Sequence, residues 1–429
     1  MLKTGSLARS NGKAGRILTT GLLAAGVMMA ATVSTAIVGV GSVGASSPLG
    51  AAHPATLAPV TVGMILDAGG SGVNEGIPIE TGAKAAIAYQ NKYGNGLEGH
   101  KINISFCENQ STPAGGQTCA NDLVQQGVVA VIEAFTDEGA TEVPTIINAG
   151  IPYIVVGGIS APELTSAGEA FSITGGAPAD IGAFALSAKA HHYKKVAFLV
   201  DNVAAAIQGV QDLGGILFKA ADVGLDVIPV NPGTADVTPQ LQAAVSSGAD
   251  AVGVFGDVSL CSSFFQAYNT LNLKLPRYAL SQCQDPSILN SPTLDKALAG
   301  SYMQANTTPT KAELAFYAAL MKKYAPSVSP NPNVSTNQAF GVQSILSLAN
   351  IMKGSTQPVT AAGIKAAAAA AKNVPIPLSG SLTFSCNGTA IPILKSVCSA
   401  AVGLGVIQAG KTAKVSHIKV YNSTQLFSS

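Results

Sequence analysis

VTVGMIL, at residues 60–66, is an apolar run rich in β-branched residues, and DAGGSG, at residues 67–72, follows it directly. Such a run predicts a buried strand, and the glycines after it permit a tight turn. An amphipathic segment at 77–93 predicts a helix, and a second strand-like run follows at 102–106. A strand, a helix and a second strand in this order form the unit from which parallel sheets are built.

The alternation of strands and helices continues along the chain and restarts after residues 171–178. We therefore predict an α/β fold with two doubly wound parallel-sheet lobes. The further predicted strands are 128–133, 152–156, 195–200, 225–230, 251–255, 277–280, 378–384 and 418–421. The further predicted helices are 114–126, 139–148, 179–190, 207–223, 237–247, 262–271, 311–324, 338–353 and 361–372.

The N-terminal segment, residues 1–45, is interpreted as a signal peptide. Its first 16 residues carry four cations and no acid, and a long apolar stretch follows to about Val43. Val43, Gly44 and Ala45 fit the small-residue pattern that a signal peptidase reads, and a cut after Ala52 is an alternative. An uncleaved membrane anchor is the competing interpretation. No cysteine precedes Cys107, so no lipoprotein attachment is expected in this exported, extracytoplasmic protein.

Composition excludes several classes of function. Only 11% of the 429 residues are charged and the net charge is +1, so no positive field exists to collect nucleic acid. Hydrophobic residues make up 47%, which excludes a disordered chain, and the absence of Trp disfavours base-stacking platforms. The low charge would also suit an acidic exterior, which we state as a hypothesis.

Six cysteines occur as three well-separated couples, Cys107 with Cys119, Cys261 with Cys283, and Cys386 with Cys398. Proximity along the chain favours three local disulfides in an oxidising compartment, although six cysteines allow about 15 connectivities. A zinc site is the alternative. No C-x-x-C pair is present and the histidines lack ligand spacing, so we expect no metal.

Catalytic motifs are absent from the sequence. There is no G-x-S-x-G elbow for a serine nucleophile and no phosphate-binding G-x-x-x-x-G-K-[ST] loop. The thiols are expected to be paired and unavailable as nucleophiles. We therefore expect a protein that is not an enzyme and has no cofactor.

Three loops that follow predicted strands offer groups for a ligand, because α/β sheets bind ligands beyond their strand carboxyl ends. Ser71 lies in the first, Thr136 and Asp137 in the second, and Gly158 and Ser160 in the third. Hydroxyls and free backbone N–H groups at such ends suit an anionic group. The alternative for each loop is a plain turn with a helix-capping hydroxyl.

Several segments resemble the leucine/isoleucine/valine-binding protein family, the type I periplasmic solute-binding proteins of ABC transporters. The resemblance spans nearly all of the chain after the leader. The segments that carry it are Thr81-Gly82-Ala83, Gly94-Asn95-Gly96-Leu97-Glu98-Gly99, Ala149-Gly150-Ile151-Pro152, Ser160-Ala161-Pro162-Glu163-Leu164-Thr165 and Asp236-Val237-Thr238-Pro239-Gln240-Leu241.

The resemblance implies two lobes joined by a hinge of three crossovers, which would fall near Pro178, Asn306 and Pro375. Lobe 1 would then comprise residues 60–178 and 306–375, and lobe 2 residues 179–305 and 376–429. Hinge closure would trap a ligand between them.

The family's amino-acid binders hold the ligand carboxylate with first-lobe hydroxyls and backbone N–H groups. The resemblance places these groups at Thr136, Ser160 and Gly158. The second-lobe acid that pairs with the ligand ammonium falls at Cys261, so Asp257, four residues earlier, is the candidate substitute. Gln282 is a further polar candidate, and the family's tyrosine after Asp201 has no equivalent.

An α-amino acid therefore requires Asp257 or Asp137 as its ammonium partner, because an unpaired buried ammonium is costly. Without that partner, the resemblance implies a carboxylate or amide ligand. We expect a monomeric solute-binding protein that delivers a small polar ligand, a branched-chain or other amino acid or a related carboxylate or amide, to an ABC transporter membrane permease. A ligand-sensing receptor is the alternative. A hydrolase using Asp137, Glu138 and Asp257 is a third hypothesis.

Overall fold

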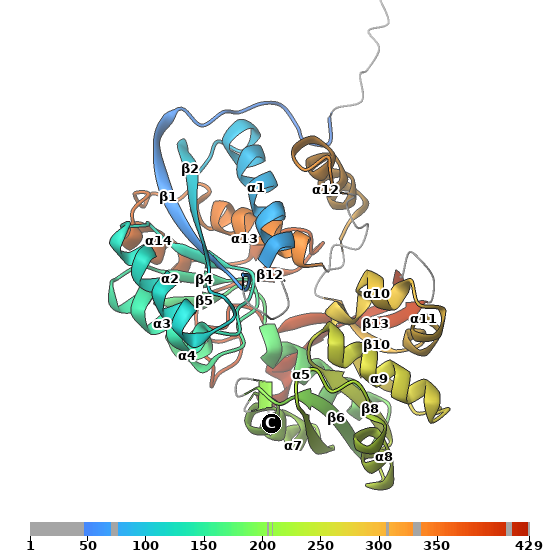
Figure 1. Ribbon diagram of the computed structural model, residues 1–429. Coiled ribbons are helices and arrows are strands. Elements are labelled where there is room, and N and C mark those ends of the chain that lie inside the picture. Colours follow the sequence, from blue (N-terminus) through green and yellow to red (C-terminus); the bar gives the residue numbers. More distant parts are fainter. Residues whose placement is uncertain are drawn as a thin grey trace, which may run out of the picture. The chain divides into compact units, whose positions relative to one another are not determined.

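Two mainly parallel β-sheets organise the chain (Figure 1). The computed structural model describes residues 47–69, 76–203, 206–207, 209–305, 309–328, 336–408 and 414–427. The predicted signal peptide and Ser71 therefore lie outside the described residues. The α/β class and the two sheets predicted from the alternation are confirmed.

The first sheet has the order β2-β1-β3-β4-β5, and all its pairs are parallel. Its central strand β1 pairs with β2 on one side and β3 on the other. The strands are β1 (Leu57–Leu66), β2 (His100–Glu108), β3 (Val131–Glu133), β4 (Tyr153–Val155) and β5 (Ala170–Ser172).

The second sheet has the order β14-β13-β10-β9-β8-β6-β7, with two antiparallel strands added at one edge of a parallel set. The parallel strands are β6 (Lys195–Asp201), β7 (Gly224–Val230), β8 (Ala251–Phe255), β9 (Arg277–Ala279) and β10 (Tyr302–Ala305); the antiparallel ones are β13 (Ala401–Gln408) and β14 (Lys414–Asn422). A small antiparallel pair joins β11 (Val374–Pro375) to β12 (Thr383–Phe384).

Helices connect the strands. Those that follow the first sheet's strands are α1 (Gly76–Tyr93), α2 (Pro113–Gln125), α3 (Gly139–Asn148) and α4 (Ala161–Thr165). Those of the middle region are α5 (Gly176–Ala190), η1 (Gly209–Leu213), α7 (Gly214–Ala220), α8 (Thr238–Ser246), α9 (Val258–Thr270), η2 (Ser281–Gln284), α10 (Pro286–Leu289) and α11 (Pro292–Leu298). The last are α12 (Lys311–Tyr324), α13 (Asn337–Met352), α14 (Ala361–Ala369) and η3 (Ser423–Phe427).

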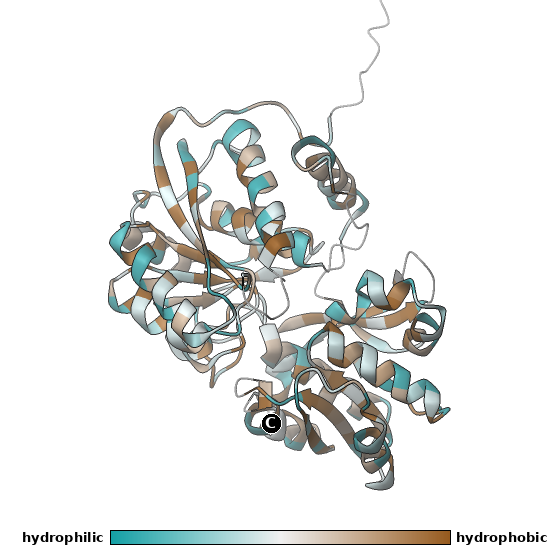
Figure 2. Cartoon of the chain, viewed as in Figure 1, coloured by the Kyte–Doolittle hydropathy of each residue, from teal (hydrophilic) through white to brown (hydrophobic). Residues whose placement is uncertain are grey.

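Both faces of each parallel sheet are covered by helices, so the strands carry apolar residues on both faces (Figure 2). Met64 of β1 packs in a core with α1, α12, α13 and α14, whereas its neighbour Ile65 packs in a separate core with α2 and α3. In the second sheet, Phe198 of β6 packs with α5 and α7, and Leu199 packs with α8 and α9. Successive side chains of a strand point to opposite faces of the sheet, so each sheet has one apolar core on either face.

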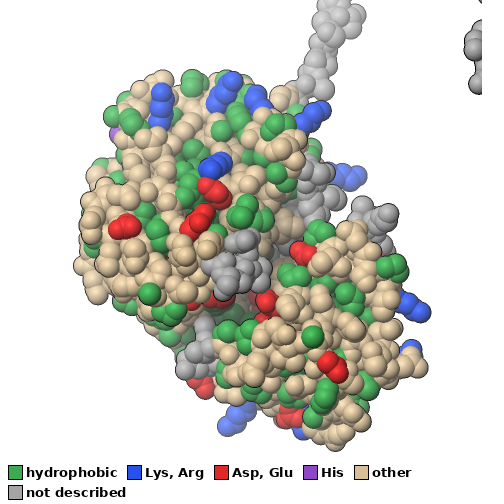
Figure 3. Space-filling model, viewed as in Figure 1, with side chains coloured by type: hydrophobic (Ala, Val, Ile, Leu, Met, Phe, Trp, Pro, Cys, Tyr) green, Lys and Arg blue, Asp and Glu red, His purple; other side chains and the backbone are tan. Residues whose placement is uncertain are grey.

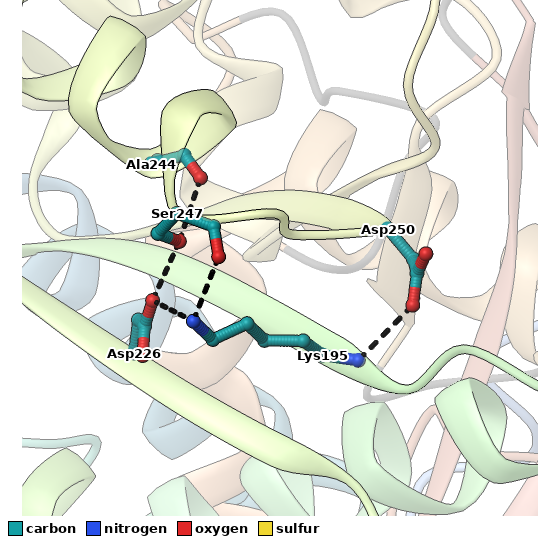
Figure 4. A network of polar contacts seen from close by, with 5 residues as sticks. All are labelled: Lys195, Asp226, Ala244, Ser247 and Asp250. Atoms are coloured by element: carbon teal, nitrogen blue, oxygen red, sulfur yellow. Dashed lines mark hydrogen bonds and ion pairs between the residues drawn. The ribbon is translucent and has the colours of Figure 1, made fainter.

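Charge contributes little to this framework. The face drawn in Figure 3 carries few charged side chains among many uncharged ones. One surface network at the start of β6 joins Lys195 Nζ to Asp226 Oδ2 at 2.9 Å, and Ser247 Oγ donates to the same oxygen at 2.7 Å (Figure 4). The backbone amide of Lys195 also donates to Asp250 at 3.1 Å. Exposed pairs of this kind contribute about 1 kcal/mol or less.

We propose that the chain passes between the two sheets three times, as the resemblance implied. The expected crossing near Pro178 falls in the first turn of α5, and the expected crossing at Asn306 lies outside the described residues. For the third passage we propose a place after Cys398 in preference to Pro375. The side chains of Ile376, Leu378 and Phe384 are buried in the core of the first sheet, so residues 376–398 pack with lobe 1.

Sequence patterns missed or misplaced a few elements. The predicted strand at 378–384 was wrong except for Thr383–Phe384. Strand β13 was not predicted, because Gly403 and Gly405 weaken a strand pattern. A Cβ at Gly403 would lie 2.6 Å from the Ala305 carbonyl oxygen, so glycine is what allows the strands to approach.

Over the residues that the structure describes, no helix is both long and apolar enough to cross a bilayer.

Two glycines allow α1 and α13 to pack with their backbones in contact. A Cβ built on Gly82 would lie 1.9 Å from the Gln338 carbonyl oxygen, and one on Gly341 would lie 2.0 Å from the Ile79 carbonyl oxygen. Only glycine, which has no Cβ, fits at either position. The Thr81-Gly82-Ala83 segment therefore has a packing role in the core of the first sheet.

We predict that Gly82→Ala lowers the free energy of unfolding by about 2 kcal/mol, because the new methyl group meets backbone that cannot move aside. Alanine would otherwise favour the helix by about 1 kcal/mol. Gly215→Ala in α7 is the matched control, because its Cβ meets nothing within 4 Å and should stabilise the protein. Urea unfolding measures both variants. Equal effects of the two substitutions would contradict the close packing.

Candidate functional site

Polar side chains gather where the strands of the first sheet end. Asp67 follows β1, Asn109 follows β2, and Thr136 lies in the loop after β3. All three side chains are buried, with exposed fractions of 6%, 0% and 1% respectively. Because these strands are parallel, their carboxyl ends share one edge of the sheet. Ligands of open α/β sheets bind at this edge.

Thr136 is held within this edge by hydrogen bonds on both sides. Its hydroxyl donates to Asp67 Oδ1 at 3.1 Å and accepts from the Glu138 amide at 3.0 Å. Asn109 Nδ2 also donates to Asp67 Oδ1. The hydroxyl proton predicted to hold a ligand carboxylate is therefore used within the protein, and Thr136 would have to release Asp67 to donate to a ligand.

Asp137 differs from its neighbours because its side chain is exposed. Its backbone amide donates to Asp67 Oδ2 at 3.0 Å, which fixes the loop beneath the carboxyl. The pKa of Asp137 is raised to about 7, chiefly because the surrounding protein desolvates its carboxyl. Repulsion from other acids adds to this effect; these are Asp67, Glu138, Asp201 and Glu163. Asp137 is thus a rim carboxyl that loses its charge just below neutral pH.

The third loop is also held by a buried carboxyl. Glu163 of α4 is 0% exposed, and its Oε2 accepts the amides of Ile159 at 2.9 Å and Ser160 at 2.7 Å. Gly158 donates its amide to Ser172 Oγ at 2.9 Å. A Cβ at Gly139 would lie 2.9 Å from Glu163 Cδ, so this glycine leaves the space that the carboxyl fills. Gly158 and Ser160 therefore lie at the expected edge with their amides engaged.

Behind the loops lies a second layer of acids that the sequence analysis did not identify. Glu133 and Glu142 are 0% exposed. Tyr153 OH lies 2.7 Å from Glu133 Oε2 and 3.4 Å from Glu163 Oε1. Asn109 Nδ2 donates to Glu142 Oε1 at 3.0 Å. Desolvation first, and neighbouring carboxylates after it, raise the pKa of Glu133 well above its usual range, and desolvation raises the pKa of Glu142 to about 8.

The second sheet repeats the arrangement of the first. Asp201 ends β6, and its Oδ2 accepts the amide of Asp257, which follows β8, at 2.6 Å. In the first sheet Asp67 accepts the amide of Asp137 in the same way. β1 and β3 are neighbours, as are β6 and β8. In each sheet, an aspartate at the end of one strand thus accepts a backbone amide from the loop that follows the neighbouring strand, and that loop carries the second aspartate.

Asp257 and Gln282 both lie at the edge of the second sheet. Asp257 is half-buried and caps α9, because its Oδ1 accepts the Leu260 amide at 2.7 Å. Gln282 of η2 donates from Nε2 to the Gly256 carbonyl at 3.0 Å, which joins the two loops. Desolvation raises the pKa of Asp201 to about 6. The structure therefore brings Asp257 and Gln282 together, with Asp201 beneath them.

Disulfides join elements beside these loops. Cys261 in α9 is bonded to Cys283 in η2, with a Cα–Cα distance of 5.4 Å, next to Asp257 and Gln282. Cys107 and Cys119 join β2 to α2 with a Cα–Cα distance of 5.6 Å. Cys386 and Cys398 form the third bond. The structure thus has the local pairing that proximity favoured, and Cys261 is occupied by a disulfide where the family's acid would stand.

Two surface hollows lie away from the strand ends. One, of about 480 Å³, is lined by residues that include Tyr89, Tyr93 and Phe316. The other, of about 400 Å³, is lined by residues that include Lys189, Lys419 and Tyr421. Neither contains a predicted ligand-binding residue.

We predict that Thr136→Val lowers the free energy of unfolding by about 1–3 kcal/mol, because it removes the hydroxyl that Asp67 and the Glu138 amide both use. Thr165→Val is the matched control. Its hydroxyl is exposed and bonds only to the Ala161 carbonyl within α4, so its loss should be about 0.5 kcal/mol or less. Urea unfolding of both proteins measures the difference. A Thr136 variant as stable as the control would show that the network does not hold the loop.

Comparison with known proteins shows what this chain is similar to. A family model described as periplasmic binding protein matches residues 59–392. Leu/Ile/Val-binding protein homolog 3 of Brucella melitensis is 28% identical over 208 residues, which are 46% of this chain and 54% of that protein. The chain thus matches about half the length of this curated relative.

Solved structures share the fold at low identity. LivJ, a branched-chain amino acid transporter substrate-binding protein from Streptococcus pneumoniae in complex with isoleucine, superposes with a TM-score of 0.67 and 18% identity, covering 85% of this chain and 99% of that one. A fatty acid ABC transporter substrate-binding protein from Thermomonospora curvata gives a TM-score of 0.69 and 14% identity, covering 90% and 98%. The predicted type I periplasmic binding fold is confirmed. The chain belongs to the periplasmic binding protein family, a family of solute-binding proteins and not of enzymes, as its sequence predicted.

Proposed function

We propose that this protein is the extracytoplasmic solute-binding protein of an ABC transporter. Its ligand would be a small polar molecule with an ammonium or amide group, held between the strand ends of the two sheets and delivered to a membrane permease. The family and the relative named for Leu/Ile/Val binding support the general activity. The observation that supports the ligand class is the set of acids at the two strand-end edges.

Acidic groups surround the proposed binding position. Asp137 is exposed at the first edge, and the charge of Asp201 at the second edge is among those that raise its pKa. Asp257 lies beside Asp201. An ammonium group would relieve the repulsion among these acids, whereas a carboxylate would add to it. Asp137 and Asp257 are therefore our proposed ammonium partners, which agrees with an amino acid and disfavours a simple carboxylic acid.

The carboxylate end of an amino acid would need donors that are not already engaged. The Thr136 hydroxyl and the Gly158 amide have acceptors within the protein. Ser71, which lies outside the described residues, stays a predicted ligand-binding residue. The buried Ser160 hydroxyl has no hydrogen-bond partner among the described residues, so it stays our predicted donor to a ligand carboxylate. An amide ligand, which carries no negative charge, would not need that interaction.

Export fits this activity. Disulfides form and persist mainly in oxidising compartments, so the three disulfides support a place outside the cytoplasm. The predicted signal peptide over residues 1–45 would provide the route. Delivery to a permease would depend on the closed form, which ligand binding stabilises.

We predict that a thermal-shift screen of the chain from Ser46 onward identifies amino acids or small amides and not simple carboxylic acids. A ligand at 100 times its dissociation constant adds about 2.7 kcal/mol to the free energy of unfolding. Asp257→Asn and Asp137→Asn should each reduce the shift for an ammonium ligand. Asparagine keeps an oxygen to cap α9, so the loss would report charge and not folding.

Glu80→Gln is the control for these variants, because Glu80 is a surface residue that pairs with Lys84. It should retain the full thermal shift. Simple carboxylic acids that stabilise the wild type, with both asparagine variants unaffected, would overturn the ammonium assignment and leave the solute-binding function in place. A chain that no small molecule stabilises would contradict the proposed function itself.

The affinity for an ammonium ligand should fall as pH decreases from 8 to 5. Asp137 has a pKa of about 7 and Asp201 of about 6, so both lose their negative charge over this range. Binding favours the ionised forms, and the ligand therefore loses its partners at low pH. Isothermal calorimetry across this range measures the effect, and Asp137→Asn should show a weaker dependence. An affinity that rises toward pH 5 would contradict it.

A further inference from the structure

Four carboxyl groups form one buried cluster behind the ligand-facing loops. Asp67 is 6% exposed, and Glu133, Glu142 and Glu163 are each 0% exposed. They come from four elements, the end of β1, β3, α3 and α4. Each of them acts electrostatically on at least one other, so they are close enough to titrate together.

No cation balances this cluster in the described part of the chain. Among the described residues, the ion pairs lie at the surface, at Lys84, Lys195 and Lys365. The groups that face the four carboxyls are uncharged or acidic: Asn109, Thr136, Tyr153, the amides of Asp137, Ile159 and Ser160, and the carboxyls of Asp137 and Glu138. Enclosing four unpaired negative charges would cost far more than the stability of a domain.

The hydrogen bonds show where protons are missing. Glu133 Oε1 and Glu142 Oε2 are buried and receive no donor. Tyr153 has one hydroxyl proton but lies within reach of both Glu133, at 2.7 Å, and Glu163, at 3.4 Å. A proton on Glu133 would let it donate to Tyr153, which could then donate to Glu163. Glu163 already accepts two amides and is the member best suited to negative charge.

We propose that Asp67, Glu133, Glu142 and Glu163 form a proton-holding cluster that positions the two ligand-facing loops of the first sheet, with protons retained on Glu133 and Glu142 at neutral pH. Asp67 holds the Asp137 amide and Glu163 holds those of Ile159 and Ser160. All four are positioning residues: Asp67 and Glu163 bond to the loops directly, whereas Glu133 and Glu142 act through Tyr153 and Asn109. This inference does not depend on which ligand the protein binds.

Alkaline pH should therefore loosen the fold at this edge. Burial raises the pKa of each member above that of an unfolded carboxyl, about 4. The folded state then binds more protons than the unfolded state between that value and the folded pKa. Stability is fully present at acidic pH and is lost as pH rises through about 8, where Glu142 ionises. Buried Asp180 of α5, bonded to Gln304, adds a change of the same sign from the second sheet.

Thermal unfolding between pH 4 and pH 9 tests the cluster in the ligand-free protein. Glu142→Gln and Glu133→Gln mimic the protonated carboxyl, and Glu80→Gln is the control. The wild type and the control should lose melting temperature as pH rises. Each cluster variant should lose less, so that at pH 9 it melts at least about 2 °C above the wild type while lying at or below it at pH 4. Because Asp180 is unchanged in all of them, the difference isolates the cluster.

Two measurements on the folded protein complete the test. Infrared spectra at pH 6.5 should contain the carbonyl band of protonated carboxylic acid, which weakens in Glu142→Gln and Glu133→Gln and not in Glu80→Gln. Hydrogen exchange, corrected for its intrinsic pH dependence, should accelerate between pH 6 and 8.5 in peptides covering residues 135–140 and 157–163 more than in α12. Absence of the band in the wild type, or variants displaced by the same amount at pH 4 and pH 9, would overturn the proposal.

Discussion

The carboxyl of Asp67 accepts hydrogen bonds from segments that lie far apart in the sequence. Asn109 comes from the end of β2, and the hydroxyl of Thr136 and the amide of Asp137 come from the loop after β3. Three neighbouring strands are thus joined at their carboxyl ends by one buried acid. The positions of Thr136 and Asp137 depend on that constraint, whereas the loop of Gly158 and Ser160 is held by Glu163 and Ser172.

The second sheet uses the same solution with different supports. Asp201 anchors the Asp257 loop as Asp67 anchors the Asp137 loop. The second edge has no layer of buried glutamates behind it; it has the Cys261–Cys283 disulfide and the Gln282 bond to Gly256 instead. The second edge therefore has a covalent bond beside its anchoring aspartate, whereas the first edge has several buried carboxyls behind its anchor. The two halves of the binding position should therefore respond differently to their surroundings.

Much of the fold could be predicted from the sequence because its strands are apolar on both faces and its helices are amphipathic or rich in alanine. The glycines at 403 and 405 concealed β13, and the run at 378–384 proved to be mostly buried coil, since apolar character alone does not specify a strand. The three disulfides have the pairing that proximity along the chain favoured, although spacing alone left the other connectivities open.

The candidate site was predictable in position but not in internal chemistry. Loops after strands identified Thr136 and Asp137, since their place follows from topology, whereas Asp257 was inferred from the family resemblance. Glu133, Glu142 and Glu163 gave no such indication, because a glutamate at the end of a strand or in a helix is ordinarily solvated. Their enclosure depends on contacts between elements, such as the space that Gly139 leaves for Glu163, and no local pattern encodes those.

A chain with so few charges nevertheless concentrates acids at one place, and the structure divides them into two populations. Glu133 and Glu142 are enclosed and receive too few donors to remain ionised, so they behave as neutral hydrogen-bonding groups. Asp137 is exposed and Asp257 is half-buried, so both lie where a ligand can reach them. A positively charged ligand would then meet negative charge only at the rim, where it can also be exchanged with solvent.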